Sequence, residues 1–435
     1  MKVMKFGGTS VGSAQRMKNV SALIAGYGKN IIVLSAMSGT TNTLVEISGY
    51  LYNRNPSGAK ETIARLKEKY DATIAELYST EEYRAKAQQY IDSVFAGLTT
   101  YTKQLFTQKE EKEILAQGEL MSTHMVAYYM QEQGMDVKLI PALEFMKTDI
   151  QGEPDQDYIR DHIRPFLEED AALYITQGYI CRNIRDEIDN LQRGGSDYTA
   201  SLVGAAVDAE EIQIWTDIDG MHNNDPRVVD NTKAVRHLHF EEAAELGYFG
   251  AKILHPTCIQ PAKFANIPVR LLNTMEPEAP GTLIDNRAEH GTIKAIAAKD
   301  NITAIKIKSS RMLLAHGFLR KVFEIFESYK TSIDMICTSE VGVSMSIDNT
   351  RHLNEIIHDL KKYGTVTVDL DMCIICVVGD MDWENVGFES RAMDAMKDIP
   401  VRMVSYGGSN YNISFLVKEE DKKRALRALS KGLFD

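Results

Sequence analysis

Short apolar runs alternate with amphipathic segments over the first two thirds of the chain, and this alternation constrains the fold most. The strand-like runs are residues 1–8, 30–39, 137–142, 171–180, 211–217 and 268–274. Helix-like segments separate them, over about 13–27 and, at greater length, over about 42–134. Strands that alternate with helices favour an α/β fold with a largely parallel sheet.

The last third of the chain predicts a tandem repeat of βαββαβ units. The first copy has strands at 302–308, 331–338, 342–348 and 365–369 and helices at 318–329 and 351–362. The second has strands at 372–379, 400–406 and 411–417 and helices at 384–397 and 419–431. Because this second copy lacks its last strand, we expect residues 293–298 to complete its sheet. A stretch with Pro and Gly breaks at 275–292 marks the boundary before the repeat.

Length and charge limit the classes of partner. The 435 residues suit two or three domains. With 49 basic and 61 acidic residues, the formal net charge is -12, which disfavours nucleic acid and anionic membranes as partners. No apolar run reaches the roughly 18 residues of a membrane helix. Lys2 and Lys5 interrupt the opening stretch, so we expect no signal peptide and a cytoplasmic protein.

The cysteines and histidines predict no metal site. The five cysteines are odd in number and scattered, unlike a disulfide framework. Cys373 and Cys376 form a C-x-x-C, but the apolar run around them favours a buried strand over a zinc site. His237, His239 and Glu241 have a spacing that could suit a metal, and a surface strand is the favoured interpretation.

A first Gly-rich segment follows the first strand. Gly7 and Gly8 expose backbone N–H groups just before a helix. These groups could bind a phosphate, and Lys5 would supply a cation. An ordinary turn is the alternative. The chain has neither a P-loop nor a Rossmann dinucleotide signature.

A second Gly-rich segment, residues 193–200, opens an apolar helix. Ser196 or Asp197 can cap that helix, and Arg193 can hold a carboxylate through two hydrogen bonds. Gly194 and Gly195 let a ligand approach the backbone. Ordinary helix capping is the alternative.

Carboxylates and a cation follow the strand at 211–217, in residues 215–220 and 225–227. Ligands bind at strand ends in open α/β sheets, although a solvated acidic turn has the same composition. Lys252 lies at another Gly break, where a surface lysine is the alternative.

Taken together, the motifs are more specific than any one of them. They are KFGGTSV at the start, GE at 118–119, RGGSDYTA at 193–200, WTDIDG at 215–220, DPRVV at 225–229 and FGAKILHP at 249–256. In order and spacing the chain resembles the aspartate kinases of the amino-acid kinase family, and its repeat is similar to their paired ACT domains. The resemblance implies an amino-acid kinase fold, a mainly parallel sheet sandwiched by helices, over 1–290. Two ferredoxin-like ACT domains would follow at 299–369 and 370–435.

The resemblance also implies an activity, the ATP- and Mg²⁺-dependent phosphorylation of the β-carboxylate of L-aspartate. The implied catalytic residues are Lys5, Asp197 and Lys252. The implied aspartate-binding residues are Ser35, Thr41, Glu119, Arg193 and Ser196. The implied nucleotide-binding residues are Gly7, Gly8, Ser10, Gly194, Gly195, Thr216, Asp217, Arg227 and Lys252.

A segment of the first repeat is similar to the lysine-sensing ACT segment of lysine-inhibited aspartate kinases. The implied effector residues are Met312, Gly317, Phe318, Leu319, Ser332, Ile333, Asp334, Ser339 and Glu340. N–H groups near residues 317–319 suit an α-carboxylate, and Asp334 and Glu340 suit the two ammonium groups of lysine. Two acids facing solvent at a sheet edge are the alternative. We expect a homodimer or homotetramer formed through the ACT domains.

Three stretches depart from the family pattern. Residues 184–192 replace a Gly- and Thr-rich run, residues 221–224 replace a stretch that often holds a tyrosine, and Ala315-His316 replaces a Ser-Arg pair. The alternatives are a related kinase acting on glutamate or acetylglutamate, and an inactive ACT amino-acid sensor. A fused homoserine dehydrogenase is not expected.

Overall fold

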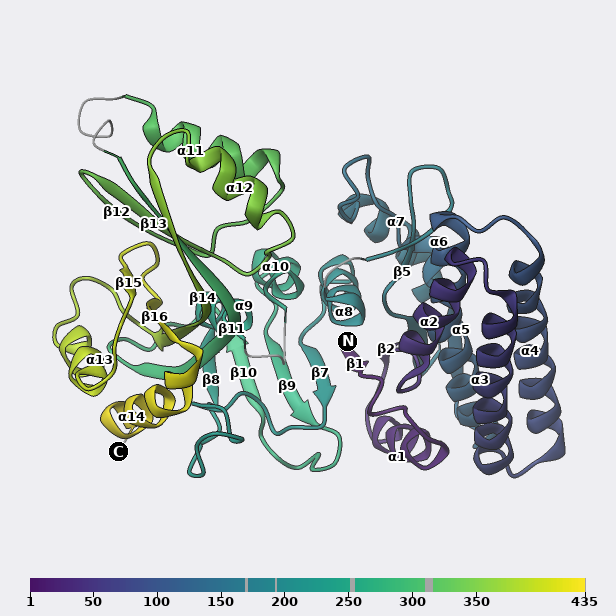
Figure 1. Ribbon diagram of the computed structural model, residues 1–435. Coiled ribbons are helices and arrows are strands. Elements are labelled where there is room, and N and C mark those ends of the chain that lie inside the picture. Colours follow the sequence, from purple (N-terminus) through teal and green to yellow (C-terminus); the bar gives the residue numbers. More distant parts are fainter. Residues whose placement is uncertain (169–170, 192–193, 251–254, 310–315, 435) are drawn as a thin grey trace. The chain divides into compact units, whose positions relative to one another are not determined.

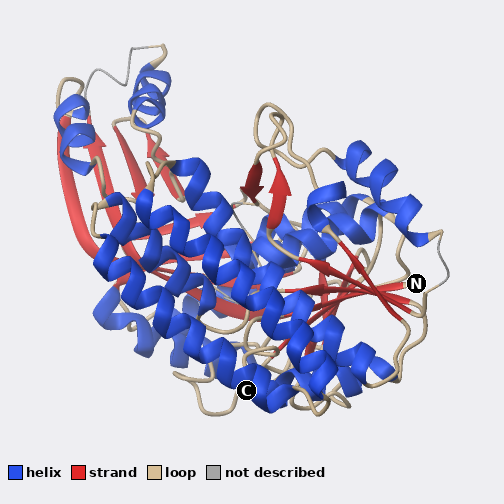
Figure 2. Ribbon diagram, turned by 90° about the vertical axis from the view of Figure 1, so that its right-hand side faces the viewer, coloured by secondary structure: helices blue, strands red, loops and turns tan. Residues whose placement is uncertain are grey.

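The computed structural model describes residues 1–168, 171–191, 194–250, 255–309 and 316–434 (Figures 1 and 2). Contacts between residues divide the chain into two compact units. The N-terminal unit comprises residues 1–221 and 254–286, and the C-terminal unit comprises residues 222–253 and 287–435. Residues 222–253 therefore cluster with the repeat, although they belong to the predicted domain 1–290. The predicted domain limits remain predictions.

A mainly parallel sheet forms the centre of the N-terminal unit. Its strands are β1 (Lys2–Phe6), β2 (Asn30–Leu34), β3 (Val137–Ile140), β4 (Leu173–Gln177), β7 (Ile212–Thr216), β9 (Val269–Asn273) and β10 (Thr282–Asp285). They lie in the order β3-β4-β2-β1-β7-β9-β10. Every neighbouring pair is parallel except β9 with the antiparallel β10. The predicted α/β fold with a largely parallel sheet is confirmed.

Helices surround this sheet. They are α1 (Ala14–Ala25), α2 (Thr40–Tyr52), α3 (Pro56–Leu77), α4 (Glu81–Thr100), α5 (Gln108–Glu132), α6 (Ala142–Phe145), α7 (Gln156–Leu167), α8 (Gly195–Ala206) and α10 (Pro256–Phe264), with a 3-10 turn at Tyr101–Lys103. The long amphipathic stretch forms α2 to α5, which lie side by side in Figure 1. Their apolar faces share one core with β1 and β2.

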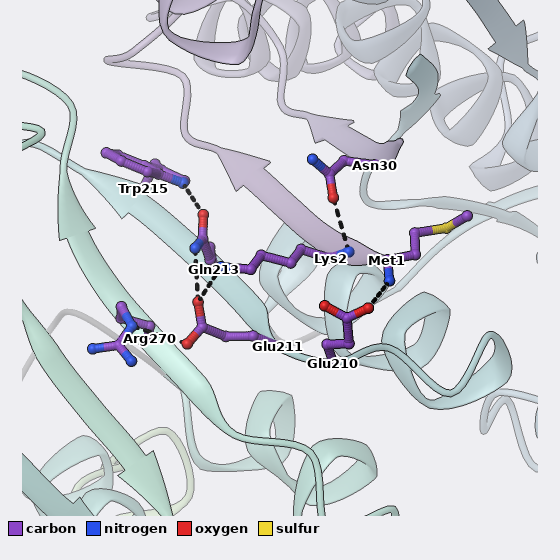
Figure 3. Close-up of polar contacts among 8 residues, drawn as sticks. All are labelled: Met1, Lys2, Asn30, Glu210, Glu211, Gln213, Trp215 and Arg270. Atoms are coloured by element: carbon purple, nitrogen blue, oxygen red, sulfur yellow. Dashed lines mark hydrogen bonds and ion pairs between the residues drawn. The ribbon is translucent and has the colours of Figure 1, made fainter. Parts of the chain in front are cut away.

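A polar network joins three strands of this sheet (Figure 3). Glu211 accepts from Arg270 Nε at 2.9 Å and from Gln213 Nε2 at 2.7 Å, and its carboxylate pairs with Lys2 Nζ at 3.5 Å. Trp215 Nε1 donates to Gln213 Oε1 at 3.1 Å. Since Lys2 lies on β1 and Arg270 on β9, the carboxylate beside β7 links both of that strand's neighbours.

The C-terminal unit contains an antiparallel sheet in the order β12-β13-β11-β14-β16-β15. Its strands are β11 (Ile293–Lys308), β12 (Met335–Ser339), β13 (Gly342–Ile347), β14 (Thr365–Gly379), β15 (Met403–Tyr406) and β16 (Asn412–Lys418). Its helices are α9 (Phe240–Tyr248), α11 (Phe318–Ser328), α12 (Leu353–Leu360), α13 (Phe388–Met396) and α14 (Lys422–Phe434), with a 3-10 turn at Glu419–Asp421. The short strand β8 (His237–His239) precedes α9.

Two long strands join the two copies of the repeat. The sequence predicts separate strands at 293–298 and 302–308, and these form the single strand β11. Its first half pairs with the second half of β14, as in Ala295 with Val378 and Ala298 with Ile375. This is the sheet of the second copy, to which the repeat assigns the segment. The helices of the two copies pack on separate cores.

The C-x-x-C segment lies in the buried half of β14, so the predicted buried strand is confirmed. Cys373 and Cys376 are buried on β14 and carry free thiols. Among the described residues, no three His, Cys, Asp or Glu side chains group as a metal site. In that same part of the chain, none of the helices has the length and apolar character needed to cross a membrane.

Candidate active site

The loops after β1 and β2 meet at one edge of the parallel sheet, because these two strands run in the same direction. Gly8 follows β1, and Ala36 lies just after β2. A Cβ atom at position 8 would come within 2.8 Å of the Ala36 carbonyl oxygen. Only glycine therefore permits this approach of the two loops.

Lys5 and Asp197 form an ion pair beside these loops. Lys5 lies on β1, Asp197 lies in the first turn of α8, and Lys5 Nζ is 2.6 Å from Asp197 Oδ1. The two side chains are 12% and 18% exposed, so the pair is largely shielded from water. The carboxylate fixes the position of the ammonium group while leaving it near the glycines that follow β1.

Gly194 and Gly195 form the tight turn that opens α8. Both have positive φ, 81° and 48°. At position 194 a Cβ atom would also lie only 1.9 Å from Cys258 Sγ. A side chain at 194 is therefore excluded by backbone conformation and by space. Arg193, a predicted site residue, lies outside the described residues.

Glu119 on α5 is the acidic group of the site. Glu119 is 4% exposed. Oε1 accepts a hydrogen bond from Ala36 N at 3.2 Å, whereas Oε2 has no partner among the described residues. Burial raises the pKa of Glu119 to about 7, against the opposing effects of the Ala36 N–H and of Lys5. One oxygen thus remains for a cationic ligand group.

A cavity of about 420 Å³ lies among these elements. Its lining residues are Gly8, Thr9, Ser35, Ala36, Met37, Ser38, Gly39, Thr41, Asn42, Glu119, Tyr179, Gly195 and Ser196. Of the predicted site residues, it brings together Ser35, Thr41, Glu119, Ser196, Gly8 and Gly195. These residues come from β1, β2, α2, α5 and α8 and the loops beside them.

The sequence did not identify Tyr179 as a lining residue. Tyr179 lies within the apolar run predicted as a strand over 171–180, but β4 ends at Gln177. The chain then turns, with a φ of 68° at Tyr179, whose N–H donates to Thr199 Oγ1 at 2.9 Å. Gly178, at the carboxyl end of a parallel strand, is the signal that could have indicated this turn.

Other predicted nucleotide-site residues lie elsewhere. Ser10 is buried and its hydroxyl lies 2.7 Å from that of Thr274. Thr216 ends β7, and its hydroxyl donates to Asp217 at 3.1 Å. Arg227 belongs to the C-terminal unit, where it pairs with Asp225 at 2.8 Å. Lys252 lies outside the described residues.

The stretch that departs from the family pattern, residues 184–192, includes part of a short hairpin. Strands β5 (Ile180–Arg182) and β6 (Ile188–Asn190) pair antiparallel. On α5, Lys112 pairs with Asp189 at 2.9 Å and Lys109 pairs with Glu187 at 3.6 Å. Acidic residues thus attach this hairpin to the helix that carries Glu119.

The predicted effector residues lie on α11, before β12 and in the β12–β13 turn. Gly317 precedes α11 with a φ of 84°, Phe318 is buried in the core, and Leu319 is exposed. Ser332, Ser339 and Glu340 are exposed, and Ile333 packs against the core. Met312 lies outside the described residues.

Asp334 does not face solvent. Its side chain is 1% exposed, and Oδ1 is 2.8 Å from Lys299 Nζ and accepts from the Tyr248 hydroxyl at 2.9 Å. Lys299 also pairs with Asp348 at 2.9 Å. Oδ2 of Asp334 has no partner in the described part of the chain, and burial raises the pKa of this carboxyl. A ligand ammonium at Asp334 would meet an acid that already has one cationic partner.

The chain is similar to known proteins over its whole length. Residues 1–273 match the amino acid kinase family, and residues 375–433 match an ACT domain. Aspartokinase 1, chloroplastic, of Arabidopsis thaliana is 34% identical, covering 100% of this chain and 80% of that protein. Lysine-sensitive aspartokinase 3 of Escherichia coli K12 is 30% identical over 100% of this chain and 99% of that protein.

Solved structures extend the match to the whole fold. E. coli aspartokinase III in complex with aspartate and ADP, in its R-state, superimposes with a TM-score of 0.87 at 30% identity and full coverage of both chains. The T-state complex of the same enzyme with lysine and aspartate gives a TM-score of 0.81. The chain therefore belongs to the aspartokinases of the amino acid kinase family.

Proposed function

We propose that this aspartokinase transfers the γ-phosphoryl group of ATP to the β-carboxylate of L-aspartate, forming 4-phospho-L-aspartate and ADP. The observation that carries the proposal is the cavity in which Glu119 presents a free, buried oxygen and which the loops beside the Lys5–Asp197 pair line. The ammonium group of a zwitterionic substrate requires an acid, and a phosphate requires a cation. The E. coli relative is known in complex with aspartate and ADP.

Aspartate is bound by charged groups and hydroxyls at the cavity. Glu119 holds the α-ammonium group, and Arg193 holds the α-carboxylate through two hydrogen bonds. Ser35, Thr41 and Ser196 orient the β-carboxylate. This group is already ionised near pH 7, so the reaction needs no general base.

The phosphate side must overcome repulsion between two anions. Lys5, oriented by Asp197, neutralises the transferring phosphoryl group, and Lys252 neutralises the nucleotide phosphates. Backbone N–H groups at Gly7, Gly8, Gly194 and Gly195 face the phosphates, while Thr216 and Asp217 belong to the nucleotide site. Mg²⁺, bound through phosphate oxygens, would lower their charge further.

The enzyme is also regulated by an amino acid. L-lysine binds the first ACT domain, with its carboxylate near Gly317 and its ammonium groups near Asp334 and Glu340, and inhibits the kinase. Inhibition requires that lysine bind the inactive state more tightly than the active state. The sites lie in a homodimer or homotetramer formed through the ACT domains of a cytoplasmic enzyme.

One coupled assay tests this function. ATP consumption is measured with aspartate, glutamate or N-acetylglutamate, each with and without lysine, threonine or methionine. We expect turnover with aspartate alone and inhibition by lysine. Equal turnover with glutamate would assign the chain to a different substrate, and no turnover with any acceptor would leave an amino-acid sensor.

A further inference from the structure

One turn of α3 supports the segment of the cavity wall formed by residues 36–39. Lys69 donates to the Ser38 carbonyl oxygen. The hydroxyl of Tyr70, which is completely buried, lies 3.0 Å from Thr40 Oγ1. Residues Met37, Ser38 and Gly39 line the cavity, so α3 acts on the site through this segment.

The same segment also contacts α5. A Cβ atom at Gly118 would lie 2.8 Å from Ala36 Cβ, and Ala36 N donates to Glu119. The segment is therefore held by contacts with both α3 and the helix that carries Glu119. Among the α3 contacts just described, only the one made by Lys69 brings a formal charge.

Lys69 carries that charge without an ion-pair partner. It is partly buried, and no carboxylate of the described residues pairs with it. Lys67 on the same helix pairs with Asp71 and Asp92, each at 2.8 Å. Burial lowers the pKa of Lys69. A partly desolvated ammonium group without a counter-ion is costly unless a negative group comes near it.

Lys69 brings its positive charge close to the cavity. Its Nζ lies 3.8 Å from where a Cβ atom of Gly39 would be, and Gly39 is a cavity residue directly before α2. The cavity is expected to receive an amino acid with two carboxylates. Negative charge is also favoured near the N-terminus of α2.

We propose that Lys69 is a positioning residue for the acidic amino-acid substrate. Through the Ser38 carbonyl it fixes the backbone of residues 38–39, and its positive charge favours binding of aspartate, which has a net negative charge at neutral pH. This inference rests on the proposed function, since it assigns to the site a further determinant of aspartate affinity. Lys69 does not touch the reacting atoms.

The test compares Lys69→Met with Lys67→Met, a matched loss of a lysine two residues away. For Lys69→Met we expect KM for aspartate to rise about tenfold, the loss of one charge-assisted contact, with kcat and KM for ATP changed less than about twofold. Lys69→Arg should recover most of the aspartate affinity. Lys67→Met should leave KM for aspartate unchanged.

Three results would overturn the proposal. They are an unchanged KM for aspartate in Lys69→Met, an equal rise in Lys67→Met, and a fall in kcat with no change in KM. Thermal unfolding of each variant separates these outcomes from loss of the fold. Wild-type enzyme that does not phosphorylate aspartate would instead refute the proposed function, and this inference with it.

Discussion

Lys5 is the residue on which the proposed chemistry depends most, because its ammonium group is shielded and held at 2.6 Å from Asp197. Lys5→Ala should lower kcat at least about a hundredfold, as expected when a group that stabilises transition-state charge is lost. Lys2→Ala, on the same strand but paired with Glu211, should leave kcat within about twofold. Steady-state rates and circular dichroism of both variants check this. A Lys5→Ala enzyme that keeps most of its kcat would remove Lys5 from the mechanism.

Glu119 gives the active site a pH dependence. Burial raises the pKa of this acid to about 7, so it is mainly protonated at pH 6 and mainly ionised at pH 8. Only the ionised form can pair with the α-ammonium group of aspartate. KM for aspartate should therefore fall as the pH rises from 6 to 8, by about tenfold at most from the ionised fraction.

The control for this pH profile is Glu119→Gln, which removes the titrating group. Its KM for aspartate should be high and nearly independent of pH over the same range. A wild-type KM that stays constant, or that rises from pH 6 to pH 8, would contradict the role of Glu119.

At the scale of elements, Glu211 connects β1 and β9 to β7, as Figure 3 shows. Glu211→Ala leaves Arg270 and Gln213 without this acceptor and should lower the free energy of unfolding by about 2 kcal/mol. Urea unfolding, followed by the fluorescence of the fully buried Trp215, measures this change. Glu210→Ala is the neighbouring control, since that side chain is 72% exposed and should contribute little. Equal effects of the two substitutions would contradict the structural role of the network.

Elements with a strong local signal could be predicted from the sequence. The parallel strands are apolar runs, and Lys5, Asp197 and the glycines lie in compact motifs at the ends of elements. The continuous strands that join the two repeats were harder to predict, because Asn301 and Asp371 look like breaks between strands. Both adopt positive φ, 60° and 55°, and β11 and β14 continue through them with a shift in register.

Contacts between distant residues left no local signal. A lysine such as Lys69 on an amphipathic helix has the sequence pattern of a solvated residue, and only the fold brings it to Ser38. In the same way, Asp334 looked like an available acid, while Lys299, 35 residues earlier in the chain, pairs with it. Tertiary structure decides which charged side chains are already paired.

At the scale of the whole molecule, we expect lysine to inhibit the kinase through the first ACT domain. Asp334→Asn keeps an acceptor for the Tyr248 hydroxyl but removes the charge that a ligand ammonium needs. It should raise the lysine concentration for half-inhibition at least about tenfold. Asp359→Asn, which alters a comparable tyrosine contact in the same repeat, is the control. Initial rates during a lysine titration measure this concentration. Unchanged inhibition in Asp334→Asn would exclude this acid from the effector site.

The proposed reaction makes an acyl phosphate on aspartate, and hydroxylamine traps such a product as a hydroxamate. Wild-type enzyme with ATP, Mg²⁺ and aspartate should form aspartyl hydroxamate in step with ADP, whereas Lys5→Ala should form almost none. Glutamate and N-acetylglutamate should give no hydroxamate. ADP release without hydroxamate, or as much hydroxamate from glutamate as from aspartate, would contradict the account.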